Sequence, residues 1–179
     1  MAEIWQVRGS YEYLGAPRQA RSSMAEPGHY LQDVWAMGHV IGVIASPDHN
    51  GGAGKAGVWA EELTRDGIIK ALRARHTFGS SGAKMALFVK SGDAIMGDKV
   101  KHPPNSVIIN VKATSMRDIK ELIIFRNNKP VYRLEPDKKE IELEWTDIKS
   151  TDDEILWYYV RIQAIDDELA WSSPIWFER

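Results

Sequence analysis

The chain has 179 residues, of which 44% are hydrophobic and 27% are charged, a composition typical of a globular protein. Its 23 basic and 25 acidic residues nearly cancel, and a net charge of −2 provides no broad basic field for nucleic acid or an anionic membrane surface. The sequence has no cysteine, which excludes disulfides, thiolate metal sites and cysteine nucleophiles, and no apolar run of the roughly 20 residues that span a membrane. We therefore expect neither nucleic acid nor a membrane as a partner.

The first part of the sequence predicts alternating strands and helices. Residues 3–7 have a short, partly apolar strand pattern, and residues 29–37 place apolar side chains three and four positions apart, the spacing of one helical face. Residues 40–45 are an almost continuous apolar run, as expected of a strand buried on both faces of a parallel sheet. A second helix is predicted over residues 64–76. Residues 1–83 therefore have the pattern of a partial α/β fold.

Beyond residue 84 the hydrophobic period changes to two, the period of strands with one solvent-facing side. Asn127 and Asn128 separate two such strands as turn residues. Seven strands in this part match the size and spacing of an immunoglobulin-like antiparallel β-sandwich over residues 84–179. The predicted strands are residues 85–89, 106–112, 119–126, 131–134, 140–145, 155–164 and 170–177.

These patterns predict an α+β chain in which a partial α/β segment, residues 1–83, precedes an immunoglobulin-like β-sandwich domain, residues 84–179. Two parallel strands and two helices leave a sheet edge and apolar helix faces without partners. We therefore expect the chain to be the C-terminal fragment of a longer protein, whose missing N-terminal part covers those faces. In the isolated fragment the same faces predict a homodimer.

The loop that follows residues 40–45 is the best candidate for a functional site, because open α/β sheets place their sites at the carboxyl ends of strands. Its residues Asp48 and His49 could bind a divalent metal, or the carboxylate could orient the imidazole as a general base. The alternative is an Asx-type turn with a surface histidine. The glycines that follow predict a flexible loop. They do not form a nucleotide-binding loop, because His49 and Ala56 occupy positions that require Gly and Ser or Thr.

Several segments resemble the C-terminal part of uncharacterised proteins related to the PHP superfamily, named after polymerase and histidinol phosphatase domains. The similar segments are residues 3–5, 9–12, 43–50, 56–65, 71–75, 158–161 and 170–176, in that order. The resemblance implies a distorted α/β barrel, of which residues 1–83 are the last elements. It also implies two or three divalent metal ions, of manganese, zinc or iron, that activate water against a phosphoester bond in the full-length parent.

The resemblance also implies which residues act. The last metal motif of the superfamily is Asp, any residue, His; Asp48 matches its Asp, whereas Asn50 stands at its His, so His49 is a ligand only if the loop is rearranged. Asp48, His49 and Asn50 are therefore the expected metal ligands, with Asp48 and His49 in catalytic roles. The superfamily's His-x-His motif has no counterpart in this sequence. One loop offers too few ligands for a multinuclear site, so we expect the chain alone to be catalytically silent, with its metal site incomplete or empty.

Two functional hypotheses follow. The chain is either the C-terminal fragment of a PHP-like, phosphoesterase-type metal-dependent hydrolase, or a non-enzymatic β-sandwich module that binds carbohydrate or protein. Trp157, Trp171 and Trp176 separate the possibilities. A flat strip of these side chains facing solvent would favour carbohydrate, whereas their burial against the N-terminal part would give them a structural role.

Overall fold

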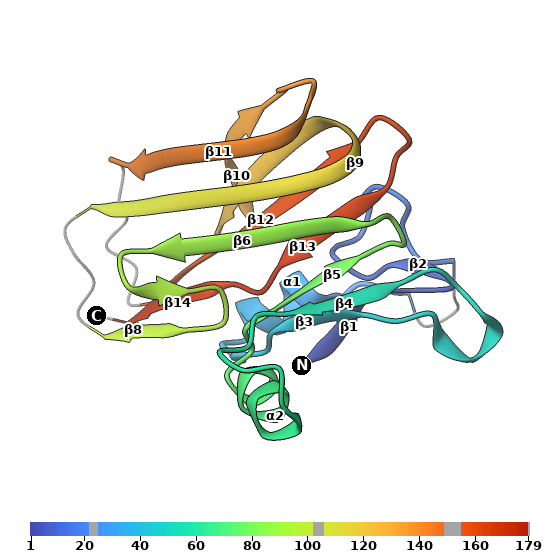
Figure 1. Cartoon of the computed structure of the whole chain (residues 1–179), viewed down its shortest axis with the longest axis horizontal. Coiled ribbons are helices and arrows are strands. Elements are labelled where there is room, and N and C mark those ends of the chain that lie inside the picture. Colours follow the sequence, from blue (N-terminus) through green and yellow to red (C-terminus); the bar gives the residue numbers. More distant parts are fainter. Residues whose placement is uncertain (22–24, 102–105, 149–154, 179) are drawn as a thin grey trace.

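The computed structural model describes residues 1–21, 25–101, 106–148 and 155–178, and it consists mainly of β-strands (Figure 1). The strands are β1 (Ala2–Gln6), β2 (Gly9–Ser10), β3 (Val43–Ala45), β4 (Lys55–Val58), β5 (Thr77–Ser80), β6 (Met85–Ser91), β7 (Ala94–Ile95), β8 (Lys99–Lys101), β9 (Val107–Arg126), β10 (Lys129–Leu134), β11 (Lys138–Asp147), β12 (Ile155–Ala164), β13 (Leu169–Ser172) and β14 (Ile175–Glu178). The helical elements within the described ranges are α1 (Leu31–Ala36), α2 (Arg65–Arg73) and a 3₁₀ turn, η1 (Asp48–Asn50).

The larger sheet has eleven strands and is organised around β9, which is 20 residues long. One half of β9 pairs antiparallel with β6 and β11, and the other half pairs antiparallel with β12 and β10. From β12 the sheet continues through β13 and β5 to β4. Register shifts opposite Ile119 interrupt the pairing near the middle of β9, and such irregularities increase the local twist of a sheet. The result is a curled antiparallel half-barrel (Figure 1).

The smaller sheet has the strand order β2-β1-β3, with β1 and β3 parallel and α1 as the connection between them. The predicted strand, helix, strand unit is therefore confirmed. The start of α1 is fixed by Asp33, whose carboxylate accepts hydrogen bonds from the backbone N–H groups of Gly28 and Tyr30, at 3.0 and 3.1 Å. This arrangement satisfies backbone donors that precede the first turn.

Two hydrophobic cores use opposite faces of the same strands, because side chains alternate along each strand. The first lies inside the curl and contains Val160 and Ile162 of β12 with apolar residues of β6, β9 and β14. The second lies on the other face, where Tyr159 of β12 and Trp171 of β13 pack against Trp5 of β1 and Trp35 of α1. The small sheet and α1 are therefore bound to the large sheet through a shared aromatic core.

The predicted fold class is wrong. The sequence predicted an α+β chain with a partial, barrel-derived α/β segment followed by an immunoglobulin-like sandwich, whereas the structure is mostly β. The difference arises in residues 55–80, where β4 and β5, at which no strand was predicted, join the large sheet through β13. In addition, β9 passes as one strand through the region where two strands were expected. The division at residue 83 remains a prediction, and strands from both sides of it share the large sheet.

Several local predictions agree with the structure. The helix predicted over residues 29–37 contains α1, and the helix predicted over residues 64–76 contains α2, whose Thr64 side chain accepts a hydrogen bond from the Gly67 N–H. β12 has its predicted bounds. Asn127 and Asn128 have the positive φ angles, 46° and 66°, of a tight hairpin turn. Neither helix in the described ranges has the length and apolar character needed to cross a membrane.

Candidate functional site

The predicted site loop follows β3 directly, as the sequence indicated. Asp48 opens η1 with a positive φ of 58°, and its backbone N–H donates to the Ser46 hydroxyl at 3.2 Å. The Ser46 hydroxyl in turn donates to the carboxylate of Glu3 on β1. These contacts fix the loop at the carboxyl ends of the parallel strands β1 and β3, beside the turn between β1 and β2.

Both oxygens of the Asp48 carboxylate accept hydrogen bonds. Its Oδ1 accepts a 2.7 Å hydrogen bond from the His49 backbone N–H, and its Oδ2 accepts one of 2.7 Å from Nη1 of Arg8. These two contacts, the backbone one first, lower the pKa of Asp48 below its ordinary value of 3.8. The His49 ring is exposed, with Nε2 3.5 Å from Asp48 Oδ1. Asp48 is therefore the ionised partner of an arginine.

This arrangement does not fit the multinuclear metal centre that the resemblance implied. The cation next to Asp48 is a guanidinium, and no group of three or more His, Asp or Glu side chains suited to one metal ion occurs among the described residues. The structure brings Asp48 and His49 together, whereas Asn50 is placed only by its backbone in η1. The metal and catalytic roles of Asp48, His49 and Asn50 thus remain predictions.

The three diagnostic tryptophans do not form an exposed strip. Trp171 and Trp176 are buried in the second core, with 0% and 2% of their surface exposed, and Trp157 is half-buried at its edge. The Trp157 indole donates to the Asn128 side chain at 3.1 Å. Their placement is structural, which removes the carbohydrate surface that the sequence left open at these positions.

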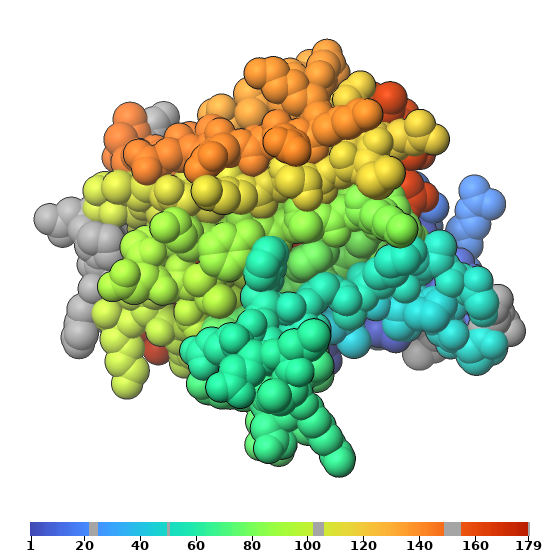
Figure 2. Space-filling model, viewed as in Figure 1, coloured from blue at the N-terminus to red at the C-terminus, as the bar shows by residue number. Residues whose placement is uncertain are grey.

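Trp59 is the exposed aromatic side chain that sequence reasoning missed. It follows β4 and keeps 38% of its surface exposed. Hydrogen bonds hold both its backbone and its indole ring. Its backbone N–H donates to the His76 carbonyl at 2.9 Å, and its indole N–H donates to the Leu87 carbonyl of β6 at 2.9 Å. The ring meets Phe88 edge-on at 4.9 Å. In Figure 2 the teal segment that contains it projects over the green surface of β6.

Two hollows flank this side chain. One, of about 400 Å³, lies between Trp59 and α2, and the other, of about 800 Å³, lies between Trp59 and the outer face of β6, β9 and β11. We call Trp59 and the residues that line both hollows the Trp59 surface. Besides Trp59, its members used below are Glu61, Glu62, Asp66, Lys70, Ala86, Phe88, Lys112, Glu140 and Glu142.

Charge on the Trp59 surface is mainly negative. Lys70 pairs with Glu61 at 2.8 Å, and Lys112 pairs with Glu142 at 2.7 Å. No ion pair involves the remaining carboxylates of the surface in the described ranges, and these are Glu62, Asp66 and Glu140. In the sequence this site is marked only by a single tryptophan after a glycine-rich segment. Such a pattern does not indicate which residues of other strands lie next to Trp59.

Comparison with known proteins gives a family. The model of a family described as "Protein of unknown function (DUF3604)" matches residues 39–130, just over half of the chain. The matched part includes the Asp48 loop and Trp59, and no PHP family accompanies the match. The chain therefore belongs to the DUF3604 family.

Individual relatives are also uncharacterised. A Chlamydia pneumoniae protein is 25% identical over 150 residues, which is 74% of this chain and 24% of that protein, and a Chlamydia trachomatis protein is 25% identical over 140 residues, 70% and 22%. The chain thus spans about a quarter of the length of these relatives. Among solved structures, a Niemann-Pick type C2 protein from Japanese carpenter ant matches with a TM-score of 0.29 and 15% identity, covering 54% of this chain and 96% of that one.

Proposed function

We propose that this chain is a non-catalytic module that binds a protein partner through the Trp59 surface. The observation that carries the proposal is an aromatic side chain that is both exposed and rigidly held. Exposed tryptophan anchors supply much of the energy of protein interfaces, since they bury a large area with little loss of conformational freedom. Trp59 meets this description, because one indole hydrogen bond and one edge-on ring contact fix it.

The lining of the two hollows indicates the chemistry of the partner. The larger hollow exposes apolar atoms of Ala86 and Phe88 beside Trp59, a composition that favours an apolar side chain of the partner. The unpaired carboxylates around both hollows favour a partner segment that also carries lysine or arginine, because complementary charge directs association and disfavours other partners. The partner expected here is a protein segment that combines a basic and an apolar residue.

A display library of random peptides, selected on the intact chain, tests this proposal. We expect enriched peptides that carry basic and apolar residues, and we expect Trp59→Ala to weaken their binding at least 30-fold, or about 2 kcal/mol, as at interface anchors. Leu63→Ala is the matched control, because Leu63 lies on the same segment and is 95% exposed. It should leave the affinity unchanged.

Two results would overturn the proposal. Peptides that bind Trp59→Ala as tightly as the natural chain would show that the surface is not the binding site. Binding to a glycan array with no selected peptide would identify a carbohydrate module instead. Sedimentation of the natural chain and Trp59→Ala adds a further test, since a dimer lost in the variant would make a second copy the partner.

A further inference from the structure

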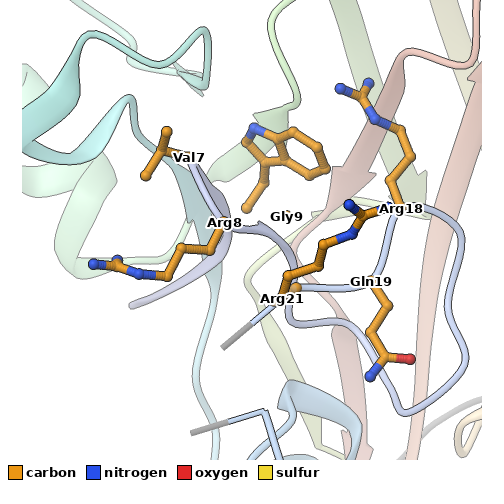
Figure 3. Close-up of a pocket in the computed structure, with 8 residues that line it drawn as sticks. Val7, Arg8, Gly9, Arg18, Gln19 and Arg21 are labelled. Atoms are coloured by element: carbon orange, nitrogen blue, oxygen red, sulfur yellow. The ribbon is translucent and has the colours of Figure 1, made fainter. Parts of the chain in front are cut away.

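A cavity of about 720 Å³ lies beside the turn between β1 and β2, and three arginines line it (Figure 3). We call it the arginine pocket; its lining residues are Trp5, Val7, Arg8, Gly9, Arg18, Gln19, Ala20 and Arg21. In Figure 3, Arg18 and Arg21 lie to the right of Gly9, and the Arg8 side chain extends to the left, away from them. None of the three was singled out by the sequence, since they are not at a motif spacing.

Backbone hydrogen bonds fix the wall that carries Arg18 and Arg21. The Ser10 N–H of β2 donates to the Arg18 carbonyl at 2.8 Å, and the Ala20 N–H donates back to the Ser10 carbonyl at 2.8 Å. The Arg21 N–H donates to the Arg8 carbonyl at 2.9 Å. The segment therefore lies alongside β2 in a defined register, and the arginines of both walls start from a rigid backbone.

Two of the guanidinium groups are also held in place. Arg18 lies 4.4 Å above the ring of buried Trp5, and its Nη1 donates to Oε1 of Glu168 at 2.8 Å. Arg8 donates through Nη1 to Asp48. Each guanidinium has five N–H donors, and the hydrogen bonds of Arg8 and Arg18 to described residues use Nη1 alone. Donors on both groups thus remain for a ligand, at side chains that are 41% and 36% exposed.

The charges of the pocket do not balance. Asp48 and Glu168 each neutralise one arginine, whereas Arg21 is exposed and has no ion pair with any described residue. Three guanidinium groups against two carboxylates leave one positive charge. A fork of N–H donors with an excess positive charge is the arrangement that binds carboxylate or phosphate oxygens most strongly.

We propose that the arginine pocket binds a small organic anion through its carboxylate or phosphate group. Arg21 supplies the unpaired charge, Arg18 supplies further N–H donors from a fixed position, and Arg8 adds positive charge at the edge of the pocket. The apolar side chains of Trp5 and Val7 contact the body of the ligand. A volume of about 720 Å³ is within the range of small-molecule sites. This site is separate from the Trp59 surface, with which it shares no residue.

Nuclear magnetic resonance on the intact chain tests the proposal through the arginine Nε–Hε and tryptophan indole signals. Inorganic phosphate and benzoate are the probes, titrated against sodium chloride at equal ionic strength. We expect saturable shifts at Arg8, Arg18, Arg21 and the Trp5 indole. Arg21→Gln should weaken the affinity at least tenfold, and Arg21→Lys should restore part of it. Arg73→Gln, at an exposed arginine on α2, is the matched control and should change nothing.

The outcomes are distinct. Shifts that grow linearly with salt, or equal shifts in Arg21→Gln, would show only screening of surface charge and would overturn the proposal. Saturation by phosphate alone or by benzoate alone would support it and identify the anionic group. The two-dimensional spectrum of each variant reports folding in the same samples. The result does not depend on Trp59, so this proposal and the proposed function can fail separately.

Discussion

Two arginine–carboxylate pairs of similar geometry occupy opposite environments in this molecule. Arg161 Nη1 lies 2.9 Å from Oε2 of Glu12, and Arg8 Nη1 lies 2.7 Å from Oδ2 of Asp48. The side chains of the first pair are 4% and 0% exposed, and those of the second are 41% and 19% exposed. By the N–O distance alone the two pairs would be expected to be equally strong. Their difference in burial indicates that they have different roles.

The buried pair fastens the N-terminal segment to the large sheet. Glu12 accepts hydrogen bonds from the Tyr159 hydroxyl at 2.7 Å and the Trp171 indole at 2.9 Å, in addition to Arg161. Burial first, and then the charge of Glu12, raise the pKa of Tyr159 well above its ordinary value. Removal of the carboxylate would leave the Tyr159 hydroxyl and the Trp171 indole without this acceptor and would take from Arg161 its nearest counter-charge, so this pair is structural.

The exposed pair keeps much of its hydrogen-bonding capacity free. Water screens the attraction between Arg8 and Asp48, and such pairs contribute little to stability. Arg8 also lines the arginine pocket, and only its Nη1 is hydrogen-bonded to a described residue. The Arg8–Asp48 pair is therefore suited to meeting a ligand, and the Glu12–Arg161 pair to holding the fold.

The largest effect is expected from Glu12→Gln. The substitution leaves Arg161 buried without its main counter-charge, since its other carboxylate, Glu121, is 3.5 Å away. We expect the free energy of unfolding to fall by about 3–5 kcal/mol, as when one partner of a buried pair is removed. Urea unfolding measures it, and Glu144→Gln, at an exposed residue of β11, serves as the control, with a change within about 0.5 kcal/mol. Equal losses in both variants would contradict the assignment.

The sequence could not predict this pair. Glu12 and Arg161 are 149 residues apart, and the preference of charged residues for the surface argued against burial of either. Sequence patterns did predict elements whose signal is local, such as β12 and the turn at Asn127 and Asn128. Of the two alternatives that the sequence left open for Trp171 and Trp176, the structure shows burial, as is usual for large aromatic side chains. What failed was the assembly of those elements.

Strands β4 and β5, which the sequence did not predict, show why the assembly could not be predicted. Gly57 of β4 pairs with Phe78 of β5, and a Cβ at Gly57 would lie 2.0 Å from the Phe78 ring. Glycine is required there so that the ring can lie across the neighbouring strand, but in a sequence glycines indicate loops. The same limit applies to the candidate site. The pattern identified the Asp48 loop, whereas Arg8, whose guanidinium pairs with the Asp48 carboxylate, comes from another strand end and lies 40 positions away.

A smaller effect on stability is expected from Asp48→Asn. The substitution removes the negative charge of the exposed pair and keeps a side chain of nearly the same shape. We expect the free energy of unfolding to change by less than about 1 kcal/mol. Because the arginine pocket then gains a net positive charge, its affinity for phosphate should rise by up to about fivefold. Urea unfolding and the phosphate titration measure the two quantities. A loss of several kcal/mol would mean that the exposed pair is as structural as the buried one.

The pKa of Asp48 reports on the strength of the exposed pair in solution. Its lowered pKa means that the ionised form is favoured in the folded chain, so the stabilisation is present above pH 3.8 and is lost as the pH falls through the lower folded value. We expect the side-chain carbon signal of Asp48 to titrate below pH 3.8. In Arg8→Gln the midpoint should rise but stay below 3.8, because the His49 backbone hydrogen bond remains. A midpoint that does not move would show that Arg8 does not bind the carboxylate in solution.

No effect at all is expected when Mn²⁺ or Zn²⁺ is added to the chain with a generic phosphodiester substrate. The Asp48 carboxylate holds a guanidinium through one oxygen and a backbone N–H through the other, so a metal ion would have to displace Arg8 from the loop. The exposed pair therefore favours the ionised form of Asp48 while its two hydrogen bonds occupy the carboxylate oxygens that would bind a metal ion. Hydrolysis should equal that of substrate and metal alone. Metal-dependent turnover that Asp48→Ala abolishes would show that Asp48 leaves Arg8 to bind a metal ion and that the chain is catalytic. The same loss in His49→Ala and Asn50→Ala would add these residues as ligands.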